Sequence, residues 1–213
     1  MRLGFFGGTF DPIHQGHLDV AEAARAALGL ERVTFVPAWL PSHRNGPVAP
    51  AAHRFAMTAL AISPYPYFCL SDLEMDPTSP SYTVNSLNRL VARGADLADW
   101  VVITGADAFG DIRTWKSYPD VLGRCHFAVV SRPDFPVSRL AEQLPELARR
   151  MRPATDGIPN EPAILLIDAP TAAVSASDVR ARAANGDSLS GMVTPEVAAY
   201  MQKHQLYVPK GHA

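Results

Sequence analysis

The segment best suited to chemistry lies near the start of the chain and combines glycines with two histidines. It reads Gly-Gly-Thr-Phe-Asp-Pro-Ile-His-Gln-Gly-His over residues 7–17. Glycines let a backbone approach a ligand closely, and a helix N-terminus provides N–H donors and a partial positive charge. His14 and His17 are three residues apart, a spacing that turns both toward one side of a first helical turn. These features predict a site for a phosphate chain.

The same segment allows two other interpretations. A plain strand–turn–helix corner, in which both histidines only cap and pack, is one alternative. Zinc is the other, because His-x-x-His can provide two ligands, although a structural zinc site needs four and no cysteine or third histidine lies nearby in the sequence. The common dinucleotide and Walker-type loops are excluded, since the segment contains neither Gly-x-Gly-x-x-Gly nor Gly-Lys-Ser/Thr.

A second candidate segment lies late in the chain, where residues 174–182 read Val-Ser-Ala-Ser-Asp-Val-Arg-Ala-Arg. Ser175 or Ser177 can cap a helix here, and either hydroxyl can instead donate to a phosphate. Arg180 follows Ser177 by three residues and returns to the same helical face. Alone, the segment indicates only a capped helix. Together with the first segment, it predicts the opposite wall of a triphosphate site.

The elements that must position these segments alternate along the chain. Six apolar runs predict strands over residues 3–6, 33–36, 68–70, 100–104, 127–130 and 163–167. Apolar residues at helical spacing predict helices over residues 16–28, 83–92, 138–150 and 195–204. This order predicts an α/β fold: a Rossmann-like, doubly wound, mostly parallel six-stranded sheet with helices on both faces. We expect one domain over residues 1–213, with C-terminal helices (about 175–205) carrying the second segment.

The composition limits the classes of function. Hydrophobic residues make up 47% and charged residues 19%, as in a globular protein. The formal net charge of −2 provides no basic field, so we expect no nucleic-acid partner. No run of 18 apolar residues occurs, so we expect no membrane partner. Cys69 and Cys125 lie in apolar runs and the N-terminus lacks signal-peptide features, which predicts buried thiols and a cytoplasmic location.

The two phosphate segments resemble signatures of the nucleotidylyltransferase superfamily. Residues 8–17 match Gly-x-Phe-Asp-Pro-x-His-x-Gly-His, and residues 175–180 match Ser-x-Ser/Thr-x-x-Arg. Over nearly its whole length the chain is similar to the bacterial nicotinate mononucleotide adenylyltransferases. The intermediate matches are residues 41–44, 53–57, 80–83, 105–107, 114–115 and 131–133.

The resemblance implies a reaction and a set of site residues. The reaction transfers AMP from ATP to nicotinate mononucleotide with release of pyrophosphate, by in-line attack of the substrate's phosphate. Mg²⁺ is the implied cofactor, held mainly by ATP phosphates, with no metal-binding residue of the protein. The implied catalytic residues are His14, His17 and Arg180. The implied ATP-binding residues are Gly7, Gly8, Thr9, Phe10, Gly16, Gly105, Asp107, Arg132, Ser175 and Ser177. The implied nicotinate mononucleotide-binding residues are His43, Arg44, Tyr82, Thr83, Trp115 and Lys116.

Several alternatives stay open at this stage. The loop over residues 37–40 lacks the Asn of many relatives, and Arg44 stands where relatives often have Lys. Instead of binding ATP, Asp107 can be the N-cap of a helix, and Arg132 can be a solvated surface residue. The whole chain has two rival interpretations, an adenylyltransferase for a phosphopantetheine-like acceptor and a non-catalytic nucleotide-binding regulator. A homo-oligomer is compatible with the sequence.

Overall fold

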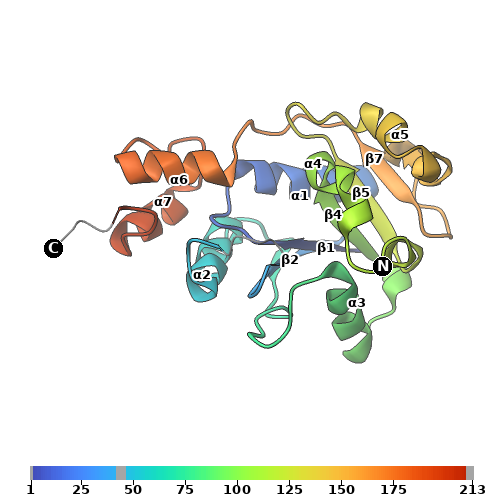
Figure 1. The fold of residues 1–213 in the computed structure, drawn as a ribbon, viewed down its shortest axis with the longest axis horizontal. Coiled ribbons are helices and arrows are strands. Elements are labelled where there is room, and N and C mark those ends of the chain that lie inside the picture. Colours follow the sequence, from blue (N-terminus) through green and yellow to red (C-terminus); the bar gives the residue numbers. More distant parts are fainter. Residues whose placement is uncertain (1, 42–46, 210–213) are drawn as a thin grey trace.

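The computed structural model describes residues 2–41 and 47–209 of the chain (Figure 1). These residues form one sheet of seven strands in the order β3-β2-β1-β4-β5-β7-β6. The strands are β1 Leu3–Gly8, β2 Arg32–Pro37, β3 Phe68–Leu70, β4 Trp100–Gly105, β5 His126–Val130, β6 Met151–Pro153 and β7 Ile164–Ile167. The strand order reverses direction between β1 and β4. In such α/β sheets, ligands bind outside the carboxyl ends of the strands at this switch point.

The sheet has one strand more than the six that the sequence predicts. All six predicted strands are present, with ends that differ by at most two residues, and every pairing between the named strands is parallel. The additional strand is β6, three residues long, at the sheet edge beside β7. Its side chains are half-buried or exposed and it ends in Pro153, so no apolar run marks it in the sequence.

The described residues form seven α-helices around this sheet. They are α1 Gln15–Leu28, α2 Ala51–Ile62, α3 Thr83–Ala92, α4 Ala106–Gly110, α5 Leu140–Gln143, α6 Ala176–Asn185 and α7 Pro195–Lys203. The long helix predicted over residues 138–150 is wrong, because 3₁₀ turns over Val137–Arg139 and Pro145–Arg150 flank the short α5. Leu144 leaves the helical region at φ −128° and ψ 62°, as expected for a residue that precedes proline.

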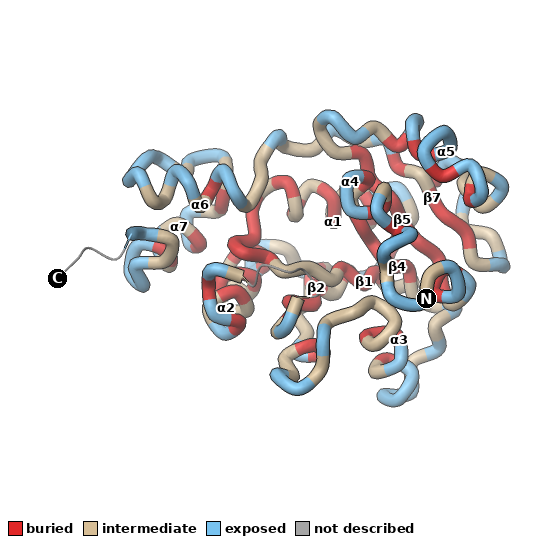
Figure 2. The backbone as a smooth tube through the Cα atoms, in the orientation of Figure 1, coloured by how far each residue is buried: buried red, intermediate tan, exposed pale blue. Residues whose placement is uncertain are grey.

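Helices cover both faces of the sheet, and each face has its own apolar core. On one face, α1 and α2 pack in a cluster with side chains such as Phe6, Phe35 and Val130, and α6 and α7 extend the same cluster at one end. On the other face, α3, α4 and α5 pack against side chains such as Phe5 and Phe127. Figure 2 shows buried residues along the strands and on one side of α1, whereas the outer side of α6 is exposed. The predicted two-sided arrangement is therefore confirmed.

The C-terminal helices lie together at one end of the molecule, where α7 packs against α2 (Figure 1). Helix α6 ends at Gly186, whose φ of 74° lies in the left-handed region that favours glycine. Thr194 caps α7 by accepting a hydrogen bond from the N–H of Val197, and proline stands in the first turn. These caps fix the loop that joins the two helices.

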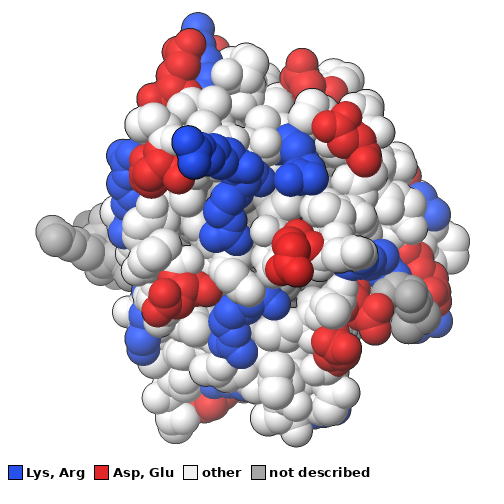
Figure 3. Space-filling view, turned by 90° about the vertical axis from the view of Figure 1, so that its right-hand side faces the viewer, with Lys and Arg blue, Asp and Glu red and all other residues white. Residues whose placement is uncertain are grey.

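The surface and the thiols have ordinary properties for a globular fold. On the face shown in Figure 3, Lys and Arg side chains lie beside Asp and Glu. None of the helices built by residues 2–41 and 47–209 has the length and apolar character needed to span a bilayer. Both cysteines are free thiols; Cys69 is half-buried, and burial raises the pKa of Cys125 to about 12.

Candidate functional site

The glycine-rich segment joins the carboxyl end of β1 to the start of α1, at the middle of the sheet. His14 is the N-cap residue of α1 and has an extended backbone. Phe10 has a φ of 48°, in the left-handed region, and its buried ring lies 5.1 Å from the ring of His17. A bulky residue keeps such a conformation only where surrounding contacts hold it. The loop therefore has a defined shape that supports His17.

The two histidines lie ring against ring over the first turn of α1. Their ring centroids are 3.7 Å apart. The backbone N–H of His14 donates to Nδ1 of His17 over 3.2 Å. Because Nδ1 of His17 accepts this bond, the proton of a neutral ring lies on its Nε2 atom. The pair thus has the common orientation that the spacing predicts, with a fixed N–H donor on His17.

Both imidazoles are neutral at neutral pH. Burial and then the nearby charge of Arg132 lower the pKa of His14 to about 3, while Asp178 acts in the opposite direction. Burial is also the main cause that lowers the pKa of His17. The charges of His14 and Arg132 act in the same direction, and the pKa lies well below 6.5. Within the described residues, Nδ1 of His14 is buried without a hydrogen-bond partner. A buried polar atom needs a partner, which an oxygen of a bound anion can provide.

Arg132 follows β5, and its guanidinium spans the space between α1 and the segment before α6. It donates from Nη1 to the carbonyl of Gly16 and from Nη2 to the carbonyl of Val174, each over 3.0 Å. Glycine is required for this approach at position 16, because a Cβ atom there would overlap Nη1 of Arg132. At Gly105 a Cβ atom would lie 3.1 Å from Cγ of Arg132. Three predicted ATP-binding residues therefore lie together.

Asp107 lies in the same corner, close to Gly105. It stands in the first turn of α4, and the N-cap of that helix is Gly105. The alternative role of Asp107 as N-cap is therefore wrong. A Cβ atom at Gly105 would overlap Oδ1 of Asp107, so the exposed carboxylate folds back over the glycine.

The second predicted segment reaches the first across the molecule. Ser175 caps α6 by accepting a 3.1 Å hydrogen bond from the N–H of Asp178, and its hydroxyl lies 2.8 Å from that of Ser177. One turn later, Nη1 of Arg180 donates to the carbonyl oxygen of Asp11 over 2.7 Å. Asp11 belongs to the first segment, 169 residues earlier in the chain. The two predicted phosphate segments therefore meet.

Hydrogen bonds from α1 hold the second segment in this place. The carboxylate of Asp19 accepts from the N–H of Ala172 over 2.7 Å, two residues before Val174. The N–H of Gln15 donates to the carbonyl of Met192, between α6 and α7, over 2.8 Å. The start of α6 is thus fixed beside the start of α1.

Four of the residues predicted to bind the pyridine nucleotide, at positions 82, 83, 115 and 116, lie in segments that pack on the face of the sheet covered by α3 and α4. Tyr82 is the N-cap residue of α3 and Thr83 is its first residue. Nζ of Lys116 lies 4.9 Å from the centroid of the Tyr82 ring. Trp115 is half-buried, with its ring 6.3 Å from that of Phe127. The segments around residues 83 and 115, far apart in sequence, are therefore neighbours.

A short connecting segment links this region to the glycine-rich loop. The N–H of Ala38 donates to the carbonyl of Gly8 over 2.9 Å, and the N–H of Ser81 donates to the carbonyl of Leu40 over 2.9 Å. The predicted site residues His43 and Arg44 lie outside the described residues.

Three residues in or beside the phosphate segments are not among the predicted site residues: Asp11, Arg54 and Tyr207. Arg54 is fully buried and donates to the carbonyls of Thr9 at 2.6 Å, Ala49 at 3.1 Å and Trp39 at 3.2 Å. The carboxylate of Asp11 is buried nearby, and the hydroxyl of Tyr207 donates to it over 2.7 Å. Most of these contacts use backbone acceptors, which leave no signal in a sequence.

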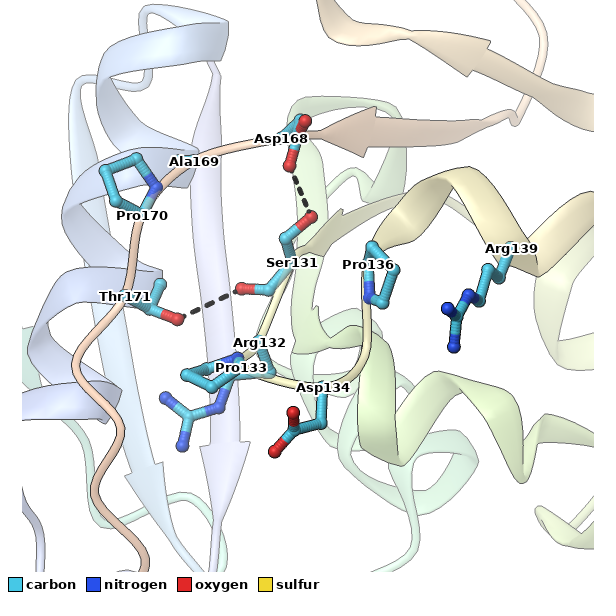
Figure 4. Close-up of a pocket in the computed structure, with 10 residues that line it drawn as sticks. All are labelled: Ser131, Arg132, Pro133, Asp134, Pro136, Arg139, Asp168, Ala169, Pro170 and Thr171. Atoms are coloured by element: carbon cyan, nitrogen blue, oxygen red, sulfur yellow. Dashed lines mark hydrogen bonds between the residues drawn. The ribbon is translucent and has the colours of Figure 1, made fainter.

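A cavity of about 560 Å³ adjoins Arg132 at the carboxyl ends of β5 and β7. Figure 4 shows Ser131 between Asp168 and Thr171, to which it is hydrogen-bonded over 2.8 Å and 3.2 Å. The volume of the cavity lies within the ~300–1,000 Å³ typical of small-molecule pockets. The cavity extends the site beyond Arg132 along the edge of the sheet.

Metal ligands do not gather in the part of the chain that the structure describes. Over residues 2–41 and 47–209, no three His, Cys, Asp or Glu side chains lie close enough to hold a metal ion together. The stacked pair of histidines offers two nitrogens, fewer than the four ligands that a structural zinc site needs.

The chain is similar to known proteins over nearly its whole length. The family model described as cytidylyltransferase-like matches residues 5–182. A probable nicotinate-nucleotide adenylyltransferase from Moorella thermoacetica is 38% identical over 210 residues, which cover 98% of this chain and 93% of the relative. A protein of the same description from Dechloromonas aromatica is 40% identical, with 96% of this chain and 97% of the relative covered.

The fold also has a solved counterpart. The nicotinic acid mononucleotide adenylyltransferase of Plasmodium falciparum, in a complex with NaAD, superposes with a TM-score of 0.76. The match covers 97% of each chain at 18% sequence identity, so it bears on the fold alone.

Proposed function

The chain belongs to the cytidylyltransferase-like family and, within it, to the nicotinate-nucleotide adenylyltransferases, and we propose that it transfers AMP from ATP to nicotinate mononucleotide. The products are nicotinate adenine dinucleotide and pyrophosphate, so the reaction is a step of NAD biosynthesis. One observation carries the proposal: Arg180 contacts Asp11, three residues before the stacked pair of His14 and His17. Donors from two distant segments are thus available to one polyphosphate.

The reaction needs positioning and charge stabilisation more than it needs proton transfer. An oxygen of the acceptor's phosphate forms a bond to the α-phosphorus of ATP, opposite the bond that breaks. The electron pair of the breaking bond leaves with pyrophosphate. Because the attacking phosphate is already ionised, no general base is required. The protein contributes by aligning both phosphates and by donating hydrogen bonds to the developing charge.

The donors assigned to that charge are His14, His17 and Arg180. The low pKa of each imidazole means that it donates a neutral N–H, while Arg180 contributes a permanent positive charge. The backbone of Gly7, Gly8, Thr9 and Phe10 adds N–H groups, and Ser177 adds a hydroxyl. Donors fixed before the reaction stabilise the transition state without reorganisation at that moment.

ATP would lie with its nucleoside toward Arg132. This corner contains Gly16, Gly105 and Asp107, and Ser175 closes it from the start of α6. The cavity at the ends of β5 and β7 offers volume next to Arg132.

The acceptor would bind between α3 and the segment that contains Trp115. The indole face can stack on the pyridine ring, which is worth about 1 kcal/mol beyond its buried area. The first N–H groups of α3, beginning at Thr83, have no partner within the helix and suit a carboxylate. An amide in the same place would turn an NH₂ group toward those donors. The site therefore favours the acid over nicotinamide.

Mg²⁺ would accompany ATP. The phosphates of ATP would hold it, and its charge would neutralise part of theirs.

The test is pyrophosphate release from ATP and Mg²⁺ with three acceptors in parallel. Nicotinate mononucleotide should give the fastest release, nicotinamide mononucleotide a slower one, and phosphopantetheine none above background. Arg180→Ala serves as the control for contaminating activity. Release with phosphopantetheine alone would indicate a different acceptor, and release with none would indicate a nucleotide-binding regulator.

A further inference from the structure

Asp11 holds together parts of the chain that are far apart in sequence. Its buried carboxylate accepts hydrogen bonds from the N–H of Val48 over 2.7 Å and the N–H of Ala49 over 3.1 Å. The hydroxyl of Tyr207, from the segment after α7, donates to Oδ1 over 2.7 Å. The side chain of Asp11 thus connects the glycine-rich loop to the C-terminal segment.

The main chain of the same residue holds Arg180. Nη1 of Arg180 lies 2.7 Å from the carbonyl oxygen of Asp11 but 4.0 Å from its carboxylate oxygen Oδ2. The guanidinium is therefore bonded to a neutral oxygen while a negative one lies nearby. A guanidinium has five N–H donors, so a bond from one nitrogen leaves others for an anion.

The hydroxyl of Tyr207 acts as a hydrogen-bond donor to Asp11. Burial, the hydrogen bond to Asp11 and the charge of that carboxylate, in this order, raise the pKa of the phenol. The hydroxyl therefore stays protonated and can only donate to Asp11. The φ of 63° at Tyr207 lies in the left-handed region, which a bulky residue rarely adopts without contacts that fix it. Here the N–H of Leu206 donates to the carbonyl of Met201 over 3.0 Å.

The surroundings leave the Asp11 carboxylate little freedom while Tyr207 is in place. Arg54 is fully buried, and its bonds to Thr9 and Ala49 fix the loops on both sides of Asp11. The charge of Asp11 raises the pKa of Arg54 against the larger effect of burial, which lowers it. If the Tyr207 hydroxyl is removed, Oδ1 loses a donor, and the guanidinium of Arg180, 4.0 Å from Oδ2 of the same carboxylate, is free to move toward it. Arg54 is held by its bonds to carbonyl oxygens.

We propose that Tyr207 is a positioning residue: by donating to the Asp11 carboxylate, it keeps Arg180 from pairing with that carboxylate and leaves the guanidinium directed at the phosphates. The inference rests on the proposed function, since it assigns Arg180 to a polyphosphate. It gives the C-terminal segment a role in the phosphate site although the segment lies outside the two phosphate motifs.

The test is a double-mutant cycle in the full-length protein. Wild type, Tyr207→Phe, Arg180→Ala and the double variant are compared for kcat with ATP and nicotinate mononucleotide, and for calorimetric ATP binding. Tyr200→Phe is the matched control, because its hydroxyl lies 3.0 Å from Nδ1 of His53 on α2, in the same C-terminal region.

We expect Tyr207→Phe to lower kcat about tenfold and to weaken ATP binding, with less change in the KM for nicotinate mononucleotide. In the Arg180→Ala background, the same substitution should change both quantities less than about twofold. An effect no larger than that of Tyr200→Phe would overturn the inference. An equal loss in both backgrounds would do so too, because Tyr207 would then act independently of Arg180.

Two further measurements keep the inference open to refutation. If wild type releases no pyrophosphate, the proposed function fails, and ATP binding across the cycle still decides the role of Tyr207. If Tyr207→Phe does not fold, Tyr207→4-aminophenylalanine replaces it, because its amino group has the place of the hydroxyl and can donate to Asp11. That variant should keep kcat within about threefold of wild type. A loss as large as that of Arg180→Ala would contradict the inference, because the donor to Asp11 is retained.

Discussion

The backbone N–H of His14 lies 3.2 Å from Nδ1 of His17 and donates a hydrogen bond to it. This contact orients the second imidazole and leaves its Nε2–H as the donor in the proposed reaction. Both pKa values lie below their usual range, so we expect a polyphosphate to meet neutral imidazole donors, with the permanent positive charge on arginines.

The first prediction concerns the ring nitrogen of His17 that donates. His17→Ala should lower kcat at least 10²-fold, as removal of one charge-stabilising donor commonly does. His17→Gln should retain more activity than His17→Asn, because only the amide nitrogen of Gln reaches the place of Nε2. Steady-state kinetics and circular dichroism check this, with the exposed His204→Ala as control. Equal activities of the Gln and Asn variants would refute the assigned donor.

The second prediction concerns stability and pH. The pKa of His14 is lowered in the folded protein to about 3, so the unfolded chain takes up a proton first as the pH falls below 6.5. The free energy of unfolding should therefore decrease between pH 6.5 and about 3, by up to about 1.4 kcal/mol per pH unit from this residue. Urea unfolding of His14→Gln should show a slope that is shallower by about that amount. Parallel slopes in the two proteins would mean that His14 titrates normally.

The third prediction concerns the contact between Gly16 and Arg132. A methyl group at position 16 would displace the guanidinium and break its bonds to the carbonyls of Gly16 and Val174. Gly16→Ala should raise the KM for ATP about tenfold and affect the acceptor less. Gly123→Ala is the control, because no atom lies within 4 Å of the added methyl group. A Gly16→Ala enzyme with an unchanged KM for ATP would remove Arg132 from the ATP site.

The fourth prediction concerns the pyridine site. Trp115→Ala should mainly raise the KM for nicotinate mononucleotide, by about fivefold to tenfold, because the ring loses its stacking partner. Trp100→Ala is the control, since this indole packs on the same core but at the amino end of β4. A change confined to the KM for ATP would show that the ring binds elsewhere.

Local sequence signals predicted the scaffold well where a segment is long or strongly apolar. Helix α3 begins and ends at the predicted residues, and α1 differs by one residue at its start. Helix α2 and strand β6 were missed: α2 is rich in alanine with a weakly polar outer face, and β6 is short and exposed. Pro145 explains the broken helix around α5, because it disfavours a helical conformation at Leu144.

The site was predictable where it depends on motifs and not where it depends on backbone acceptors. The types and spacing of three residues identified them as candidates: His14, His17 and Arg180. A hydrogen bond from Arg180 to the carbonyl oxygen of Asp11 holds it at the segment that contains both histidines. Arg54 also binds carbonyl oxygens, and any residue type presents those. Tyr207 contacts Asp11 across 196 residues, a separation that no local pattern reveals.

A crystal structure with a non-hydrolysable ATP analogue would show whether the two phosphate segments bind one polyphosphate. We expect phosphate oxygens of a single analogue about 3 Å from Nε2 of His17 and from a guanidinium nitrogen of Arg180. A triphosphate bound away from either group would contradict this expectation.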